Sequence, residues 1–115
     1  MKLGDLERNV MEVHWSRMDE DLSVRDVAEN FPDHAYTTIM TVLTRLAAKG
    51  FLIESKQGRL NHFRARAPRE DYIASLMMEA LSSASDRHAV LARFAQEIPA
   101  SDANFFRKIF ARRPR

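Results

Sequence analysis

The sequence predicts a mainly α-helical fold with one small β-hairpin after the third helix. Apolar residues recur at the helical spacing of three and four residues in six segments of the chain. Between residues 51 and 65 this spacing gives way to the pattern of a β-hairpin. A chain of 115 residues, 45% hydrophobic and 30% charged, is long enough for one modest globular domain with an extension.

The first two helices are expected over residues 6–16 and 24–30. Asp5 is the expected N-cap of the first helix. Ser23, with Asp26 three residues later, forms a variant of the capping box at the start of the second helix. The side chains expected to face the core are Leu6, Val10, Met11, Val13, Trp15, Val24, Val27, Ala28 and Phe31.

The third helix, expected over residues 35–49, has two faces of different composition. Its apolar arc comprises Ile39, Val42, Leu43 and Leu46. The opposite side carries Thr37, Thr41, Thr44, Arg45 and Ala48, and no acidic residue occurs from residue 35 to residue 50. Threonine is a mediocre helix former, so helix propensity does not explain this face. Hydroxyls can bond phosphates or base edges and arginine can bond guanine, so the face suits a nucleic acid.

A cationic hairpin follows the third helix. Gly50 is expected to end the helix in a left-handed conformation. Strands are expected over residues 51–56 and 60–65, and Leu22 is expected in a further, very short strand. The hairpin carries the cations Lys56, Arg59 and Arg64 and the histidine His62. Phosphate binding is the role we expect for these cations.

Three more helices are expected over residues 68–83, 87–98 and 102–111. Asp86 is the expected N-cap of the middle one. Each of these helices has an apolar stripe, which a helix fully surrounded by water would not be expected to carry. The stripes comprise Ile73, Leu76, Met77, Ala80, Leu81, Val90, Leu91, Phe94, Ile98, Phe105, Phe106, Ile109 and Phe110. These side chains need a partner surface, either in the same chain or in a second copy.

Three helices followed by a hairpin form the winged helix-turn-helix arrangement, with the third helix as the reader of DNA. The charge distribution agrees with this assignment. Residues 34–66 hold six basic residues and one acid, whereas residues 1–33 hold four basic residues and nine acids. The electropositive third of the chain therefore contains the threonine-rich helix and the hairpin.

Several other classes of protein are disfavoured by composition. The chain has no cysteine, which excludes disulfides and thiolate metal sites. It has no long apolar run and no hydrophobic signal core, so we expect no membrane association and a cytoplasmic location. The four histidines share no metal-ligand spacing, and no nucleophile–base arrangement is recognisable. We expect no catalytic residue, no metal and no cofactor.

The motifs resemble the penicillinase-repressor family over nearly the whole chain. They are Leu6-Glu7-x-x-Val10-Met11-x-x-x-Trp15, the segment Leu22-Ser-Val-Arg-Asp-Val27, and Ala35-Tyr-Thr-Thr-Ile-Met-Thr-Val-Leu-Thr-Arg-Leu-x-x-Lys-Gly50, before a basic wing that contains Gly-Arg. The resemblance implies a dimeric winged-helix repressor that binds a pseudo-palindromic operator and dimerises through its C-terminal helices. It also implies that Thr37, Thr38, Thr41 and Arg45 face DNA, and that the wing contacts the DNA backbone.

Two departures from the family pattern bear on regulation. The copper-responsive branch carries a C-terminal cysteine cluster, and the absence of cysteine here excludes copper sensing through thiolates. Some members release DNA when a membrane-sensor protease cuts an Asn-Phe bond in the dimerisation region. The matching position here is Arg93-Phe94, which argues against a sensor protease as a partner, although Asn104-Phe105 supplies that dipeptide one helix later.

The sequence therefore predicts a winged-helix DNA-binding domain over residues 1–67 and a C-terminal helical dimerisation region over residues 68–115. The predicted DNA-binding residues are Thr37, Thr38, Thr41, Arg45, Lys56, Arg59 and Arg64. The predicted dimerisation residues are Ile73, Met77, Leu91, Phe94, Phe105, Phe106 and Phe110. Two alternatives stay open: a winged-helix module that binds another protein, and a helix-turn-helix regulator gated by a small ligand.

Overall fold

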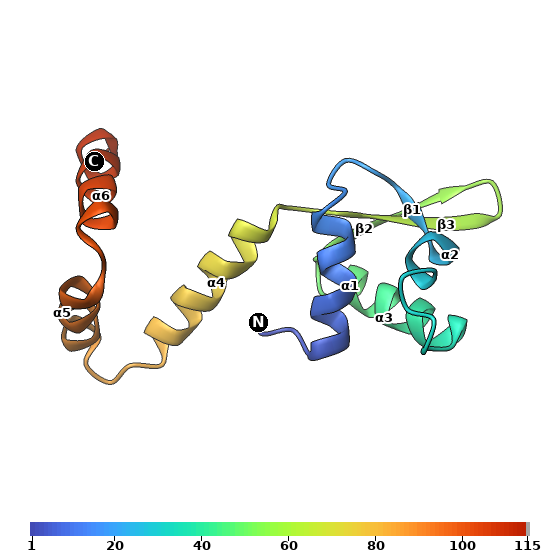
Figure 1. Ribbon diagram of the computed structural model, residues 1–115, viewed down its shortest axis with the longest axis horizontal. Coiled ribbons are helices and arrows are strands. Elements are labelled where there is room, and N and C mark those ends of the chain that lie inside the picture. The colour runs from blue at the N-terminus through green and yellow to red at the C-terminus, as the bar shows by residue number, and fades with distance from the viewer. Residues whose placement is uncertain (115) are drawn as a thin grey trace. The chain divides into compact units, whose positions relative to one another are not determined.

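A computed structural model describes residues 1–114, and Arg115 lies outside the described residues. The chain divides into two compact units, Met1–Leu76 and Met77–Arg115. The first unit contains α1 (Asp5–Trp15), β1 (Leu22–Ser23), α2 (Val24–Ala28), α3 (Tyr36–Ala48), β2 (Leu52–Gln57) and β3 (Leu60–Ala65) (Figure 1). This order confirms the predicted winged helix-turn-helix.

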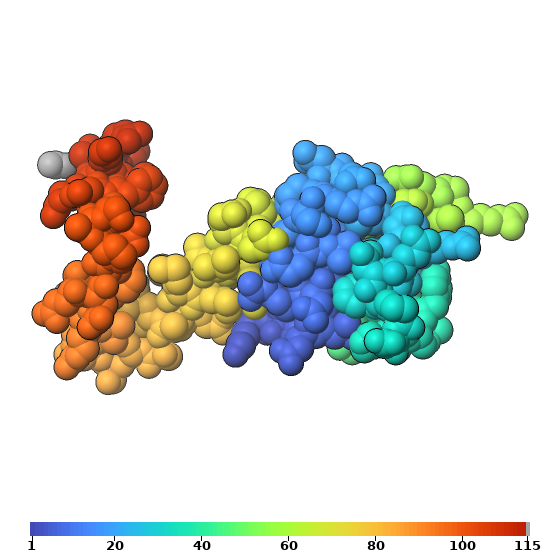
Figure 2. All heavy atoms as spheres, in the orientation of Figure 1, coloured from blue at the N-terminus to red at the C-terminus, as the bar shows by residue number. Residues whose placement is uncertain are grey.

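The three strands form one antiparallel sheet in the order β1-β3-β2. In the register, Leu22 of β1 lies opposite Phe63 of β3, and Leu52 of β2 lies opposite Ala65. The hairpin β2–β3 is the wing, and its tip stands clear of the rest of the first unit in the space-filling view (Figure 2).

Short-range signals in the sequence fix the ends of the helices. The capping box at α2 is confirmed, because the Asp26 amide donates to Ser23 Oγ and the Ser23 amide donates to the Asp26 carboxylate at 3.0 Å. Gly50 has φ +88°, the left-handed conformation expected at the end of α3. The N-cap prediction for α1 was wrong: Gly4 takes that place, and its amide donates to the carboxylate of Glu7.

The core of the first unit comes from all of its helices and strands, as the apolar spacing predicted. Its fully buried side chains include Val10, Met11, Val27, Ile39, Leu43 and Leu46. Two polar side chains are buried among them without having been predicted, Glu7 and His14.

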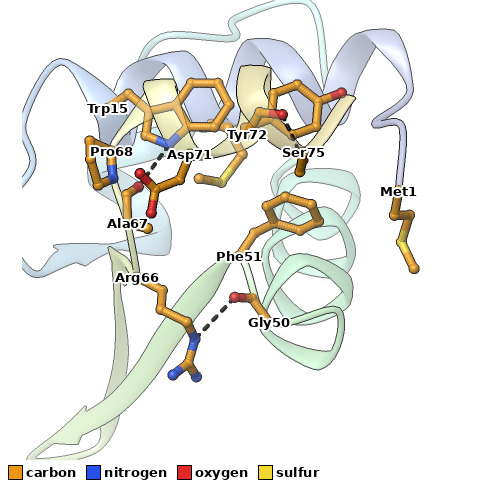
Figure 3. A pocket seen from close by; sticks show the side chains of 11 residues that line it. Met1, Trp15, Gly50, Phe51, Arg66, Ala67, Pro68, Asp71, Tyr72 and Ser75 are labelled. Carbon is orange, nitrogen blue, oxygen red and sulfur yellow. Dashed lines mark hydrogen bonds between the residues drawn. The ribbon is translucent and has the colours of Figure 1, made fainter. Parts of the chain in front are cut away.

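The start of α4 (Arg69–Ser82) is anchored in the first unit by an aromatic cluster (Figure 3). The ring of Tyr72 stacks on Trp15 at a centroid distance of 5.5 Å, and Phe51 meets Tyr72 edge to face at 5.7 Å. The Trp15 indole donates to the carbonyl of Ala67, and the amide of Leu3 donates to the Tyr72 hydroxyl. Tyr72 was not among the side chains expected in the core.

The second unit contains the end of α4 together with α5 (Arg87–Glu97) and α6 (Ala100–Arg112). The predicted cap of α5 is confirmed, since the Asp86 carboxylate accepts from the Ala89 amide. Helix α6 begins two residues earlier than expected, because Pro99 acts as its N-cap and its carbonyl accepts from the Asp102 and Ala103 amides. No described residue of α5 or α6 is buried within the single chain.

Candidate nucleic-acid interface

Helix α3 presents a polar, acid-free face outside the core. Its residues Ile39, Val42, Leu43 and Leu46 are buried against the rest of the first unit. On the other side, the predicted residues Thr37, Thr38, Thr41 and Arg45 are all exposed, together with Thr44. The structure therefore brings the four predicted residues of α3 together on one accessible face, where they can meet a partner simultaneously.

The threonine hydroxyls of α3 are not equivalent. Thr41 Oγ1 donates to the carbonyl of Thr37 at 2.9 Å, and Thr44 Oγ1 donates to the carbonyl of Met40 at the same distance. A hydroxyl whose proton is bonded within the helix keeps its lone pairs free to accept. Thr41 and Thr44 are therefore preset as acceptors, which suits the amino groups of cytosine and adenine.

Arg45 is the free cation of this face. Among the described residues its guanidinium has no hydrogen-bond or ion-pair partner. Its polar neighbours on the helix, Thr41 and Lys49, are both bonded to other groups. It lines a hollow together with Thr38, Thr41 and residues 4–7 at the start of α1, which include the acids Asp5 and Glu7. An unpaired guanidinium beside small side chains can approach a phosphate or a guanine edge without breaking an existing bond.

Lys49, one turn further along, has a structural role instead. Its Nζ lies 2.7 Å from Oε2 of Glu7, whose side chain is only 11% exposed. This hydrogen bond, with a second one from the Gly4 amide, holds the pKa of the Glu7 carboxyl below its usual range, and the charge of Arg45 adds to the effect. The pair ties the end of α3 to the start of α1. Sequence reasoning missed Glu7 because its partner lies 42 positions away.

The wing carries its three predicted cations at different places. Arg59 occupies the turn between the strands, beside Gly58 with φ +66°. Lys56 pairs with Asn61, and Glu54 pairs with the buried Phe63. Because side chains two residues apart on a strand lie on the same face, Lys56 lies on the same face of the sheet as Phe63. Arg64 lies on the opposite face, because it directly follows Phe63 on β3 and successive side chains of a strand point to opposite faces. All three side chains are exposed.

Outside this surface, the described residues form neither a cluster that could hold a metal ion nor a helix that could cross a membrane. No group of three or more histidine, cysteine, aspartate or glutamate side chains in residues 1–114 could hold a metal ion. His14 is fully buried, and neither of its ring nitrogens has a hydrogen-bond partner. None of the described helices combines the length and the apolar character that crossing a bilayer requires.

A sequence model of the family described as penicillinase repressor matches residues 3–112. The chain belongs to the penicillinase-repressor family. The family assignment confirms the predicted resemblance. The members of this family are transcriptional regulators and not enzymes.

Similar proteins of known description support the family assignment. The chain is 40% identical to the transcriptional regulator BlaI of two Mycobacterium tuberculosis strains, CDC 1551 / Oshkosh and ATCC 25618 / H37Rv, over 96% of this chain and 83% of each relative. Among solved structures, the adhesin competence repressor of Streptococcus pyogenes is 17% identical with a TM-score of 0.50, covering 96% of this chain and 77% of that one. A MarR family protein from Bacillus stearothermophilus is 14% identical with the same TM-score, covering 96% and 72%. These two likenesses support the fold alone.

This family member exposes most of its predicted dimerisation residues. Ile73 and Met77 on α4 are 41% and 53% exposed, and Phe105 and Phe110 on α6 are 61% and 59% exposed. Leu91 and Phe94 on α5 are also exposed, while Phe106 is partly covered by ring contacts with Phe94 and Phe110. Within one chain these apolar side chains remain largely in water.

Proposed function

We propose that this member of the penicillinase-repressor family represses transcription by binding an operator as a homodimer, with α3 in the major groove of DNA. Thr37, Thr41 and Arg45 point toward base edges in this proposal. The observation that carries it is the exposed, acid-free face of α3 with the unpaired Arg45 guanidinium. A polyanion is the partner that such a face fits, because no carboxylate on the helix repels phosphate.

Contacts to phosphate set the register of the protein on DNA in this proposal. Thr38 and the wing residues Lys56, Arg59 and Arg64 take this role, since all four are exposed. Phosphate contacts carry no sequence information and make binding depend on salt. The proposal places the protein in the cytoplasm, where it can reach chromosomal DNA.

A second copy of the chain would cover the apolar side chains of the C-terminal helices. The predicted residues on α4, α5 and α6 are exposed in one chain, and exposed apolar surface of this kind typically marks an interface. A twofold dimer presents two recognition helices to two half-sites, which matches a pseudo-palindromic operator. Occupying such an operator blocks access of RNA polymerase to the promoter.

The proposal is tested by selecting a preferred duplex from random DNA with the full chain and comparing affinities by fluorescence anisotropy. Arg45→Ala should weaken binding by about 1–3 kcal/mol if the guanidinium bonds a base edge. Arg17→Ala is the matched control, because Arg17 pairs with Glu20 in the loop between α1 and β1, across the first unit from α3 (Figure 1). Equal affinities of the Arg45→Ala variant and the control would overturn the role of α3.

A further inference from the structure

A hollow in the first unit lies where α2, α3 and the tip of the wing meet. Its lining includes Arg25 at the start of α2, Tyr36 and Met40 on α3, and Arg59, Leu60 and Asn61 at the wing. The pairing of Ser23 with His62 brings the start of α2 beside the start of β3, so segments far apart in sequence converge here. Arg25 was not among the predicted binding residues.

The hollow combines two cations with exposed apolar side chains. Arg25 and Arg59 are exposed, and neither guanidinium has a hydrogen-bond or ion-pair partner among residues 1–114. No acid occurs among the described residues that line it, and the nearby Asp26 carboxylate is bonded to the Ser23 amide. The same lining includes the apolar side chains of Tyr36, Met40 and Leu60, which are 50%, 43% and 58% exposed.

This combination fits the sugar-phosphate backbone of DNA. A guanidinium bonds the oxygens of a phosphodiester with two parallel hydrogen bonds, and deoxyribose offers apolar C–H groups to an aromatic or aliphatic side chain. The hollow is also continuous with the face of α3. It shares Val24, Met40 and Asn61 with a neighbouring hollow that Thr41, Thr44 and Arg45 line.

We infer that this hollow seats one phosphodiester of the DNA backbone beside the site read by α3, with Arg25 and Arg59 as its two ligands and Tyr36 against the adjoining deoxyribose. The inference rests on the proposed function and adds a contact from α2 to it. Arg25 thereby links the first helix of the helix-turn-helix to the same strand segment that the wing tip holds. The hollow fixes the position of the wing relative to the groove.

The inference is tested on the selected duplex with the full chain, by measuring affinity at several salt concentrations. Arg25→Ala should lower affinity about tenfold and flatten the dependence of log K on log salt by about one unit per subunit. Arg25→Lys should keep most of the salt dependence, because the charge remains. Tyr36→Ala should lower affinity with an unchanged salt dependence, because no charge is removed.

A chemical change in the DNA identifies the phosphate itself. Replacing single phosphates by neutral methylphosphonates should reveal one position per half-site that weakens the wild type more than it weakens Arg25→Ala. The same replacement should not further weaken the double variant Arg25→Ala with Arg59→Ala, which lacks both ligands of that phosphate. If Arg25→Ala binds like the Arg17→Ala control at all salt concentrations while Arg45→Ala loses affinity, the seat is refuted and the proposed function stands. If the wild-type chain binds no duplex, the proposed function itself fails.

Discussion

The buried His14 makes the stability of the first unit depend on pH in a way that can be calculated. Its side chain is fully buried and neither ring nitrogen has a partner. Burial lowers the pKa of His14 from 6.5 to about 4, and the positive charge of Arg17 acts in the same direction. In the unfolded chain the ring is solvated and takes up a proton near its ordinary pKa.

The unfolded state therefore binds more protons than the folded state between pH 6.5 and about pH 4. The stability associated with the neutral ring is fully present above pH 6.5 and is lost as the pH falls toward 4. Each unit of pKa corresponds to about 1.4 kcal/mol, so the whole fall corresponds to about 3 kcal/mol. Most of it, about 2–3 kcal/mol, should be lost by pH 4.5.

Urea unfolding followed by circular dichroism, at equal protein concentration and at pH 7.5 and 4.5, measures this loss. His14→Leu removes the titrating ring, so it should lose about 2–3 kcal/mol less than the wild type between the two pH values. Carboxylates such as Glu7 titrate in both proteins, and their contribution cancels in the comparison. An identical loss in His14→Leu would refute the reasoning.

Three further sets of substitutions test other parts of the account. Phe105→Asp combined with Phe110→Asp should give monomers in sedimentation, because a carboxylate cannot sit unpaired in an apolar interface; a persisting dimer would mean that these rings pack elsewhere. Gly50→Ala should lower the free energy of unfolding, measured by thermal unfolding, by about 1–2 kcal/mol, because alanine is strained at φ +88° even though its methyl group would meet no neighbour. An unchanged free energy of unfolding would show that the backbone at residue 50 is not strained by alanine. Lys49→Met should cost about 1–3 kcal/mol because Glu7 loses its charged partner, and a further Glu7→Gln change should recover part of that.

The fold could be predicted from sequence wherever local chemistry sets it. The capping box of Ser23 and Asp26 and the left-handed Gly50 are contained in short segments, and both are confirmed. The strand over residues 60–65 was predicted with its observed bounds. These features depend on neighbours within a few residues, so a single sequence contains the information.

What the sequence did not reveal depends on distant partners. Glu7 is buried because Lys49 neutralises it, and Tyr72 is buried because Trp15 and Phe51 surround its ring. The hollow that includes Arg25 likewise forms only when the sheet brings α2 beside the wing. The polar face of α3 was predictable, because helical spacing alone separates it from the core.

The measurement that tests the central claim most directly is a hydroxyl-radical footprint of the full chain on its selected duplex. The account predicts two protected half-sites whose centres lie about one helical turn of roughly 10 base pairs apart, or a multiple of it. It predicts that Arg45→Ala clearly reduces both protections at a protein concentration that half-saturates the wild type. A footprint unchanged in Arg45→Ala, or the absence of any protection at low salt, would contradict the claim that α3 reads DNA.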